Sequence, residues 1–143
     1  MGSKYDVLKL ENQLCFPLYA ASKEIVRHYK PILDELDMTY TQYITMMVMW
    51  EHKELSVKEL GKYLYLDSGT LTPLLKTLEG KGWIVRARSK EDERVLNVTI
   101  TEQGNKLRDK ALKIPSQISA CVKLEPEEAM QLYTTLHKIL DNL

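Results

Sequence analysis

Hydrophobic residues recur at helical spacing over the first quarter of the chain, where two prolines interrupt them. Residues 8–30 are expected to be helical, and Pro17 requires either a kink or a restart of the helix with Pro17 in its first turn. Pro31 is expected to close this segment, because the residue before a proline avoids the helical conformation. Residues 31–36 are then expected to form a short helix of their own.

Three further helices are predicted from capping residues that stand directly before apolar runs. The caps are Thr39 with Gln42, Ser56 with Glu59, and Asp67 or Ser68. The runs that follow are an apolar helix with Met46, Met47, Met49 and Trp50, a short helix with Leu60, Tyr63 and Leu64, and a helix from about residue 69 to 78 that Gly80 and Gly82 stop. Residues 52–55 are expected to be a simple link between the first two.

The second half of the chain changes period and then returns to helices. Alternation within residues 83–88 and 95–100, around the charged segment 89–94, predicts a β-hairpin with a polar tip. Thr101 is expected to cap a long helix to about Cys121, kinked at Pro115, and a last helix begins at about residue 125. The predicted fold is therefore mainly α with one β-hairpin.

The order of elements from residue 56 to 100 favours a winged helix-turn-helix. Two short helices are joined by a tight link, and the second would enter a DNA major groove while the hairpin contacts the minor groove. The candidate DNA-binding residues are Ser68, Gly69, Thr70, Thr72 and Lys76 on the second helix, which are small or basic, and Arg86, Arg88, Lys90, Asp92 and Arg94 on the hairpin, which are charged. The alternative is that these elements merely pack against one another.

Charge supports this interpretation only locally. The 143 residues hold 20 basic and 20 acidic side chains, so the net charge is zero. Residues 53–90, however, hold eight Lys or Arg against four Asp or Glu, which is a possible electrostatic footprint for a polyanion or simple statistical unevenness. No apolar run approaches ~18 residues and no secretory signal is recognisable, so the expected location is the cytoplasm and no membrane contact is expected.

Known catalytic and cofactor fingerprints are missing from the sequence. Neither a P-loop, a nucleophile elbow, a zinc-protease motif nor a dinucleotide fingerprint occurs, so no enzyme activity, catalytic residue or cofactor is expected. The two cysteines, Cys15 and Cys121, lie far apart and form no CxxC pair, and the three histidines have no metal-ligand spacing. No metal site is therefore predicted.

Cys15 lies among tyrosines along the chain, which raises the possibility of redox chemistry. Tyr19 follows by four residues, whereas Tyr29 lies about 20 Å further along a straight helix. Tyr29 would therefore reach the Cys15 of its own chain only if the segment folds sharply, but it could reach the Cys15 of a partner chain that crosses antiparallel. The alternative is that Cys15 is a small buried apolar residue. The methionines beside Trp50 are similarly either core filler or an adaptable wall of a ligand pocket.

Three segments together carry a family resemblance that covers nearly the whole chain. Residues 56–101 are similar to the winged-helix portion of the MarR family of bacterial transcription regulators. The segments 67–76 (DSGTLTPLLK), 91–94 (EDER) and 10–16 (LENQLCF) resemble its organic hydroperoxide sensing branch, the OhrR type.

The resemblance implies a homodimer that binds double-stranded DNA at a pseudo-palindromic operator. Cys15 matches the peroxidatic cysteine of that branch, and Tyr29 and Tyr40 match the tyrosines that hydrogen-bond it from the opposite subunit. Cys121 lies near a second cysteine that in some members resolves the oxidised residue as an intersubunit disulfide. If Cys121 is instead a bystander, a low-molecular-weight thiol has to cap Cys15.

The expected organisation is one domain, 1–143, with residues 1–52 and 102–143 as dimerisation helices and 53–101 as the DNA-binding lobe. The expected function is a repressor that leaves its operator when an organic hydroperoxide oxidises Cys15. Two alternatives stay open: a MarR-type repressor released by a small aromatic ligand, with no redox role for Cys15, and a thiol peroxidase.

Overall fold

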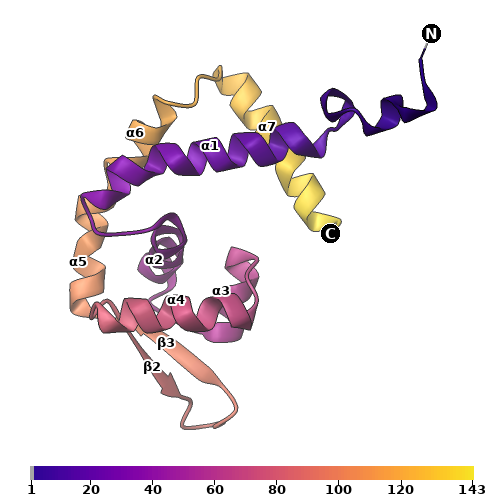
Figure 1. Ribbon diagram of the computed structural model, residues 1–143. Helices are drawn as coiled ribbons and strands as arrows, with labels where there is room; N and C mark the ends of the chain where they lie inside the picture. Colours follow the sequence, from indigo (N-terminus) through magenta and orange to yellow (C-terminus); the bar gives the residue numbers. More distant parts are fainter. Residues whose placement is uncertain (1) are drawn as a thin grey trace.

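The computed structural model describes residues 2–143, which form seven α-helices, two short 3-10 helices and a three-stranded sheet (Figure 1). In chain order the elements are η1 (Lys4–Leu8), η2 (Leu10–Asn12), α1 (Cys15–Asp34), α2 (Tyr40–His52), β1 (Glu54–Ser56), α3 (Val57–Leu64), α4 (Ser68–Gly80), β2 (Ile84–Arg88), β3 (Leu96–Ile100), α5 (Glu102–Ala111), α6 (Ile114–Ser119) and α7 (Pro126–Asp141).

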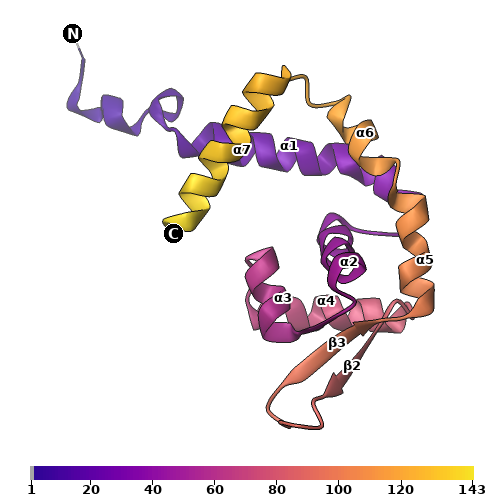
Figure 2. The same ribbon diagram turned by 180° about the vertical axis from the view of Figure 1, so that it is seen from behind.

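The elements are arranged on two levels that α5 connects at one side (Figures 1 and 2). One level holds α1, α6 and α7, and the N-terminal segment projects beyond it. The other holds α2, α3, α4 and the β2–β3 hairpin. Among residues 2–143, no helix is both long enough and apolar enough to cross a membrane.

Helix α1 differs from the sequence-based prediction at both ends. It begins at Cys15, so Pro17 lies in its first turn. Of the two alternatives predicted for Pro17, a kink or a helix that starts there, the second is confirmed. The expected helix over residues 8–14 is wrong, because short 3-10 turns and extended residues occupy that segment. The expected break at Pro31 is also wrong: α1 continues through Pro31 to Asp34. The hydrogen bond that a proline loses there is offset by burial of Leu33, which is 1% exposed.

Local capping signals are confirmed at three helices. Thr39 and Ser56 each form a complete capping box, and Asp67 rather than Ser68 caps α4. The expected long helix after Thr101 is instead two helices: α5 ends at Ala111, and Pro115 lies in the first turn of α6.

The predicted hairpin is confirmed, and a third strand joins it. β3 lies between β1 and β2 and is antiparallel to both, with Val98 opposite Leu55 on one side and opposite Arg86 on the other. Residues 54–56 are therefore a strand and not part of a simple link. With only three residues, β1 is too short to show alternation, and its pairing with β3 decides its conformation.

One continuous hydrophobic core holds the winged elements together. Met46, Met49 and Trp50 of α2 are buried in the same cluster as residues from α3, α4, β2 and β3, and the cluster continues to Leu33 and Ile114. The boundary at residue 52 was expected to separate the dimerisation helices from the DNA-binding lobe. It falls between α2 and β1, and both elements contribute to this one core.

Candidate nucleic-acid interface and thiol site

Helix α4 presents a small, polar N-terminal end to solvent. The side chain of Asp67 accepts a hydrogen bond from the Thr70 N–H at 2.8 Å, which holds the pKa of Asp67 below its ordinary value. Ser68, Gly69, Thr70 and Thr72 are exposed at this end, whereas Leu71, Leu75 and Leu78 are buried on the other face. The buried leucines fix the helix on the core, so its first turn is free to approach a ligand closely.

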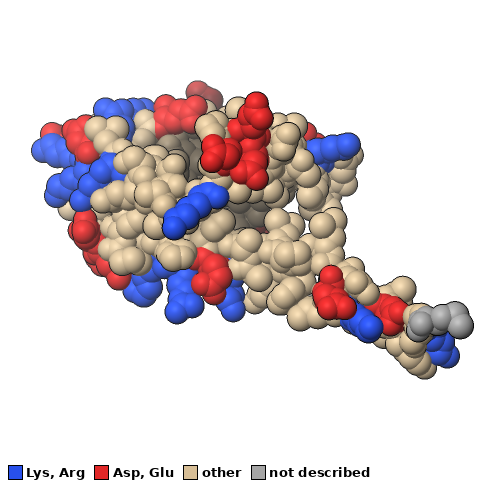
Figure 3. Space-filling model, turned by 90° about the horizontal axis from the view of Figure 1, so that it is seen from above, with Lys and Arg blue, Asp and Glu red and all other residues tan. Residues whose placement is uncertain are grey.

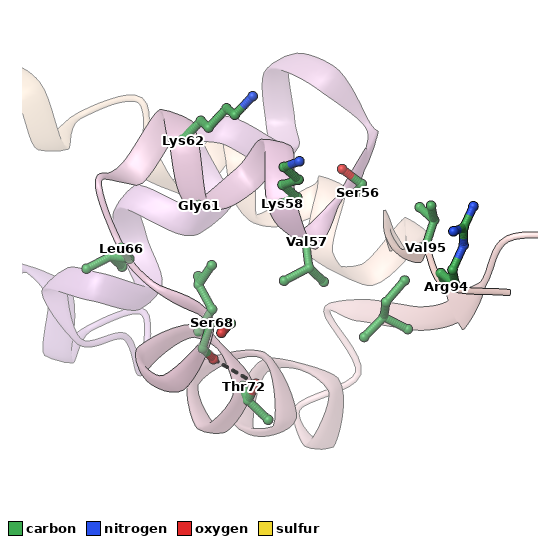
Figure 4. A pocket seen from close by; sticks show the side chains of 12 residues that line it. Ser56, Val57, Lys58, Gly61, Lys62, Leu66, Ser68, Thr72, Arg94 and Val95 are labelled. Carbon is green, nitrogen blue, oxygen red and sulfur yellow. Dashed lines mark hydrogen bonds between the residues drawn. The ribbon is translucent and has the colours of Figure 1, made fainter. Parts of the chain in front are cut away.

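A cleft of about 600 Å³ separates the start of α4 from α3 and β3 (Figure 4). Its walls are largely apolar and include Val57, Leu66, Leu71, Val95 and Leu96. Lys58 and Lys62 rise from α3 on one side, Arg94 stands at the far end, and Ser68 and Thr72 line the α4 side. Sequence reasoning missed the two lysines, although their spacing of four residues on a short helix places them on one face.

A bidentate ion pair shapes the tip of the hairpin. Arg94 donates from Nε to Asp92 Oδ1 at 3.0 Å and from Nη2 to Oδ2 at 3.1 Å. These hydrogen bonds, with a further one from the Arg94 backbone N–H, lower the pKa of Asp92. The Arg94 side chain is nevertheless 90% exposed. Asp92 therefore positions a guanidinium that still faces solvent, near the exposed Arg88 and Lys90.

Arg86 lies on strand β2 of the predicted hairpin and is largely enclosed there. Its side chain is only 18% exposed, and its Nη2 contacts Glu79 of α4 at 3.1 Å. The Arg86 backbone N–H also donates to Glu79 at 2.9 Å, and these bonds lower the pKa of Glu79. Arg86 therefore ties strand β2 to helix α4. Alternation alone cannot reveal this, because Glu79 comes from a different element.

Tyr29 and Tyr40 meet within one protomer. Their rings stack with centroids 4.8 Å apart, and Tyr43 joins them with its centroid 5.8 Å from that of Tyr29. Burial, with the neighbouring Tyr40 and Tyr43, raises the pKa of Tyr29 to about 12, and burial also raises the pKa of Tyr40. Both phenols keep their protons at neutral pH, as an ordinary tyrosine also does, and each can donate a hydrogen bond.

Cys15 is separate from this tyrosine cluster in the same chain. It is exposed as the first residue of α1, and the 14 residues to Tyr29 correspond to about 20 Å of helix. Cys121 is also a free, exposed thiol and lies just beyond α6, where its Sγ donates to the Gln117 carbonyl at 3.6 Å. The structure therefore brings together the predicted Tyr29 and Tyr40, but neither of the predicted cysteines with them.

Large apolar side chains are exposed around Cys15 and along the C-terminal helix. None of the residues of α7 is buried. The exposed apolar residues in these two regions include Leu10, Leu14, Phe16, Leu18, Met130, Leu132, Tyr133 and Ile139. Seen from the α1 side, uncharged residues cover much of the middle of the molecule, which is hollowed there (Figure 3). Such an extended apolar surface is typical of an interface rather than of an isolated monomer.

A smaller cavity of about 320 Å³ lies between α2 and the α5–α6 region. Tyr43, Met47 and Trp50 line one side, and the charged lining residues are Arg108 and Glu51, one of each sign. Of the three methionines that the sequence singled out, Met46 and Met49 are core residues and Met47 lines this cavity. Residues 2–143 contain no group of His, Cys, Asp or Glu side chains that could hold a metal ion.

The model of the family "Transcriptional regulator SarA/Rot" matches residues 27–111. The organic hydroperoxide resistance transcriptional regulator of Bacillus subtilis (strain 168) is 50% identical over 143 residues, which are 100% of this chain and 97% of that protein. The solved structure of reduced AbfR bound to DNA has a TM-score of 0.79 and 32% identity, and the match covers 97% of this chain and 96% of that one. Disulfide-formed AbfR has a TM-score of 0.66 and 34% identity over 96% of each chain. The Bacillus subtilis relative is a transcriptional regulator, and AbfR is a protein solved bound to DNA.

Proposed function

Because the chain belongs to the OhrR type of the MarR family of winged-helix, DNA-binding transcription regulators, we propose that it is a repressor that leaves its operator when an organic hydroperoxide oxidises Cys15. The observation that carries this proposal is that helix α1 begins with an exposed thiol, Cys15, and about 20 Å further along carries Tyr29, which stacks on Tyr40. A second copy of the chain supplies the missing half of the site.

A homodimer formed through α1, the N-terminal segment and α7 is the assembly that suits this arrangement. Their exposed apolar side chains would be buried, and antiparallel α1 helices would bring the Cys15 of one subunit to the Tyr29 and Tyr40 of the other. Two winged lobes then face a pseudo-palindromic operator, with half-sites about one helical turn apart.

Each lobe meets the DNA through the elements around the cleft. The first turn of α4, with Ser68, Gly69, Thr70 and Thr72, enters the major groove, and Lys76 lies further along the same helix. Arg94, positioned by Asp92, reaches the minor groove or the backbone together with Arg88. Lys58 and Lys62 add phosphate contacts from α3.

The sensing step is a two-electron oxidation of sulfur. The Cys15 thiolate attacks the terminal oxygen of the hydroperoxide ROOH, the O–O bond breaks, and the leaving alkoxide takes up a proton to become the alcohol ROH. The sulfur loses two electrons and becomes the sulfenic acid Cys15–SOH, while the peroxide is reduced. The added oxygen no longer fits the hydrogen bonds from Tyr29 and Tyr40, so the subunits move relative to one another and the two α4 helices lose the half-site spacing.

A thiol completes the reaction with Cys15–SOH. Its sulfur bonds to the Cys15 sulfur and water leaves, which gives a disulfide. Cys121 of the partner chain is one candidate, since both cysteines are exposed in the protomer. A low-molecular-weight thiol is the other. The Cys121→Ser variant separates them: a covalent dimer on non-reducing gels that disappears in the variant supports Cys121, and a mixed disulfide in both proteins supports the small thiol.

Fluorescence anisotropy on a labelled fragment of the protein's own promoter tests the proposal. We expect tight binding that stoichiometric organic hydroperoxide abolishes and dithiothreitol restores. The matched control is Cys15→Ser, which should bind the fragment and ignore peroxide. Binding by the wild type that is indifferent to peroxide, or a normal peroxide response from Cys15→Ser, would remove Cys15 from the mechanism.

The cavity beside Met47 supports a second candidate, a repressor released by a small aromatic acid. Its aromatic and thioether walls suit a ring, and Arg108 suits a carboxylate. Benzoate added to the Cys15→Ser variant under reducing conditions tests it. Release of DNA that Arg108→Gln prevents supports the ligand, and unchanged DNA binding at saturating benzoate counts against it.

A further inference from the structure

Lys81 joins the end of the DNA-reading helix to the turn between α1 and α2. It is the residue directly after α4, and its ammonium group contacts Asp37 Oδ2 at 3.4 Å and Gln42 Oε1 at 3.2 Å. The same group donates to the Asp37 backbone carbonyl. A single side chain therefore bridges α4 and a segment about 40 residues earlier in the chain.

This bridge is more enclosed than an ordinary surface ion pair. The Lys81 side chain is 24% exposed and its ammonium lies 4.7 Å from the centre of the Trp83 ring, whereas Lys113, which pairs with Glu35, is 52% exposed. Gln42 is buried. The Lys81 and Gln42 side of the bridge is therefore partly shielded from water, whereas the Asp37 carboxylate is 90% exposed.

The partner Gln42 belongs to the turn of helix that carries a tyrosine of the thiol site. Tyr40 is the first residue of α2 and Gln42 is the third. Gln42 Oε1 also accepts the Thr39 N–H at 3.1 Å, so the capping box and Lys81 share one oxygen. A displacement of Tyr40 therefore moves the acceptor that holds Lys81.

We propose that Lys81 is the positioning residue that transmits the state of the Tyr29–Tyr40 pair to helix α4. This inference rests on the proposed redox function and names the contact through which that function reaches the DNA. When oxidation of Cys15 shifts Tyr40, the first turn of α2 draws Gln42 and Asp37 away, and Lys81 carries the C-terminal end of α4 with them.

The geometry of α4 enlarges this movement. Its 13 residues span about 20 Å, and the proposed base-contacting residues lie at the opposite end from Lys81. Because Leu71, Leu75 and Leu78 fix α4 on the core, the helix moves together with its lobe, and a tilt of about 10° displaces the first turn by about 3 Å over that length. A displacement of that size breaks a direct hydrogen bond to a base edge, because such a bond is lost once donor and acceptor are more than about 3.5 Å apart.

The test compares operator affinity before and after oxidation in three variants. Lys81→Met keeps the aliphatic stem over Trp83 but removes the ammonium. Lys81→Arg keeps a cationic donor. Lys113→Met removes the same charge from the exposed pair with Glu35 and serves as the matched control. For each protein the dissociation constant of the promoter fragment is measured by anisotropy, with Cys15 reduced and with Cys15 oxidised by an organic hydroperoxide.

We expect the ratio of the oxidised to the reduced dissociation constant to fall at least fivefold in Lys81→Met. The ratio should be restored largely in Lys81→Arg and unchanged in Lys113→Met. The rate at which Cys15 is oxidised should stay at the wild-type value in all three, because Lys81 does not touch the thiol. A merely structural role would weaken both forms equally and leave the ratio unchanged.

A wild-type ratio in Lys81→Met overturns the inference and leaves the proposed function standing. A wild-type protein whose DNA affinity does not respond to oxidation overturns both. If Lys81→Met does not fold, Asp37→Asn replaces it, since the Asp37 side chain is 90% exposed and only the ion pair is lost. A smaller fall in the ratio supports the inference, and an unchanged ratio in that variant overturns it.

Discussion

Replacing Gly104 by alanine should destabilise the protein, although alanine is the better helix former. Gly104 lies in the first turn of α5 and is buried. A Cβ there would lie 2.1 Å from the carbonyl oxygen of Trp83 and 2.9 Å from its carbonyl carbon. That oxygen is itself fixed, because it accepts a hydrogen bond from the Thr101 N–H at 3.1 Å. Neither side of the contact is the flexible end of a side chain, so the backbone has to move.

The size of the effect follows from the contacts that this movement disturbs. Contacts below 3.0 Å essentially do not occur at a real Cβ, so α5 must retreat by about 0.9 Å (3.0 − 2.1) from the Trp83 carbonyl. Overpacking of this kind costs roughly 1–3 kcal/mol. The retreat also stretches the buried hydrogen bond from Trp50 Nε1 to the Gly104 carbonyl, now 2.9 Å, at a further cost of roughly 1–3 kcal/mol. The gain in helix propensity is only about 1 kcal/mol.

A net loss of about 3 kcal/mol corresponds to a fall in Tm of roughly 10 °C for a chain of this size. Circular dichroism melts at one fixed protein concentration measure it, because the melting temperature of a dimer depends on concentration. The matched control is Gly80→Ala in α4, where a Cβ meets nothing within 4 Å. That variant should be neutral or slightly more stable. A Tm for Gly104→Ala that equals or exceeds the wild-type Tm would refute the expected clash with the Trp83 carbonyl.

Three further outcomes are expected. Trp50→Phe removes the donor to the buried Gly104 carbonyl and should lower the free energy of unfolding in urea by roughly 1–3 kcal/mol; an unchanged midpoint contradicts this. Arg94→Ala should weaken binding to all DNA sequences and reduce the slope of log affinity against log salt by about 0.9, so full affinity would exclude a phosphate contact. Folding holds the proton on Tyr29 to a higher pH than in the unfolded chain, so stability should fall as the pH rises from 10.0 toward the pKa of about 12. Tyr29→Phe should lose less stability over this pH range than the wild type. An equal loss in both proteins would contradict a role for Tyr29 in this pH dependence.

Much of the secondary structure was predictable from residues that lie close together in the sequence. The capping boxes at Thr39 and Ser56 were recognisable because a cap and its partner lie three residues apart, and no distant contact is needed to form them. The hairpin was predictable for a similar reason, since alternation over 84–88 and 96–100 reports one buried face. Even the separation of Cys15 from Tyr29 followed from the rise of a helix alone.

Local rules failed where a distant element decided the outcome. Pro31 was expected to end a helix, but α1 continues through it to Asp34, and this last turn contains the buried Leu33. Residues 54–56 carry no recognisable strand pattern, and they are a strand because β3 lies beside them. The contact of Arg86 with Glu79, on a neighbouring helix, was likewise not predictable from the alternation of the hairpin.

The sequence by itself determined the helices from α2 to α4, the β2–β3 hairpin, the small polar start of α4 and the candidate thiol, because each depends on residues within a few positions of one another. The tertiary structure alone decided which charged groups are free and which are structural. Arg94 faces solvent, whereas Arg86 and Lys81 are held by partners from other elements. The physical reason is that the environment of an ion pair or a close glycine contact, such as Gly104 against Trp83, is set by chain segments that meet only after folding.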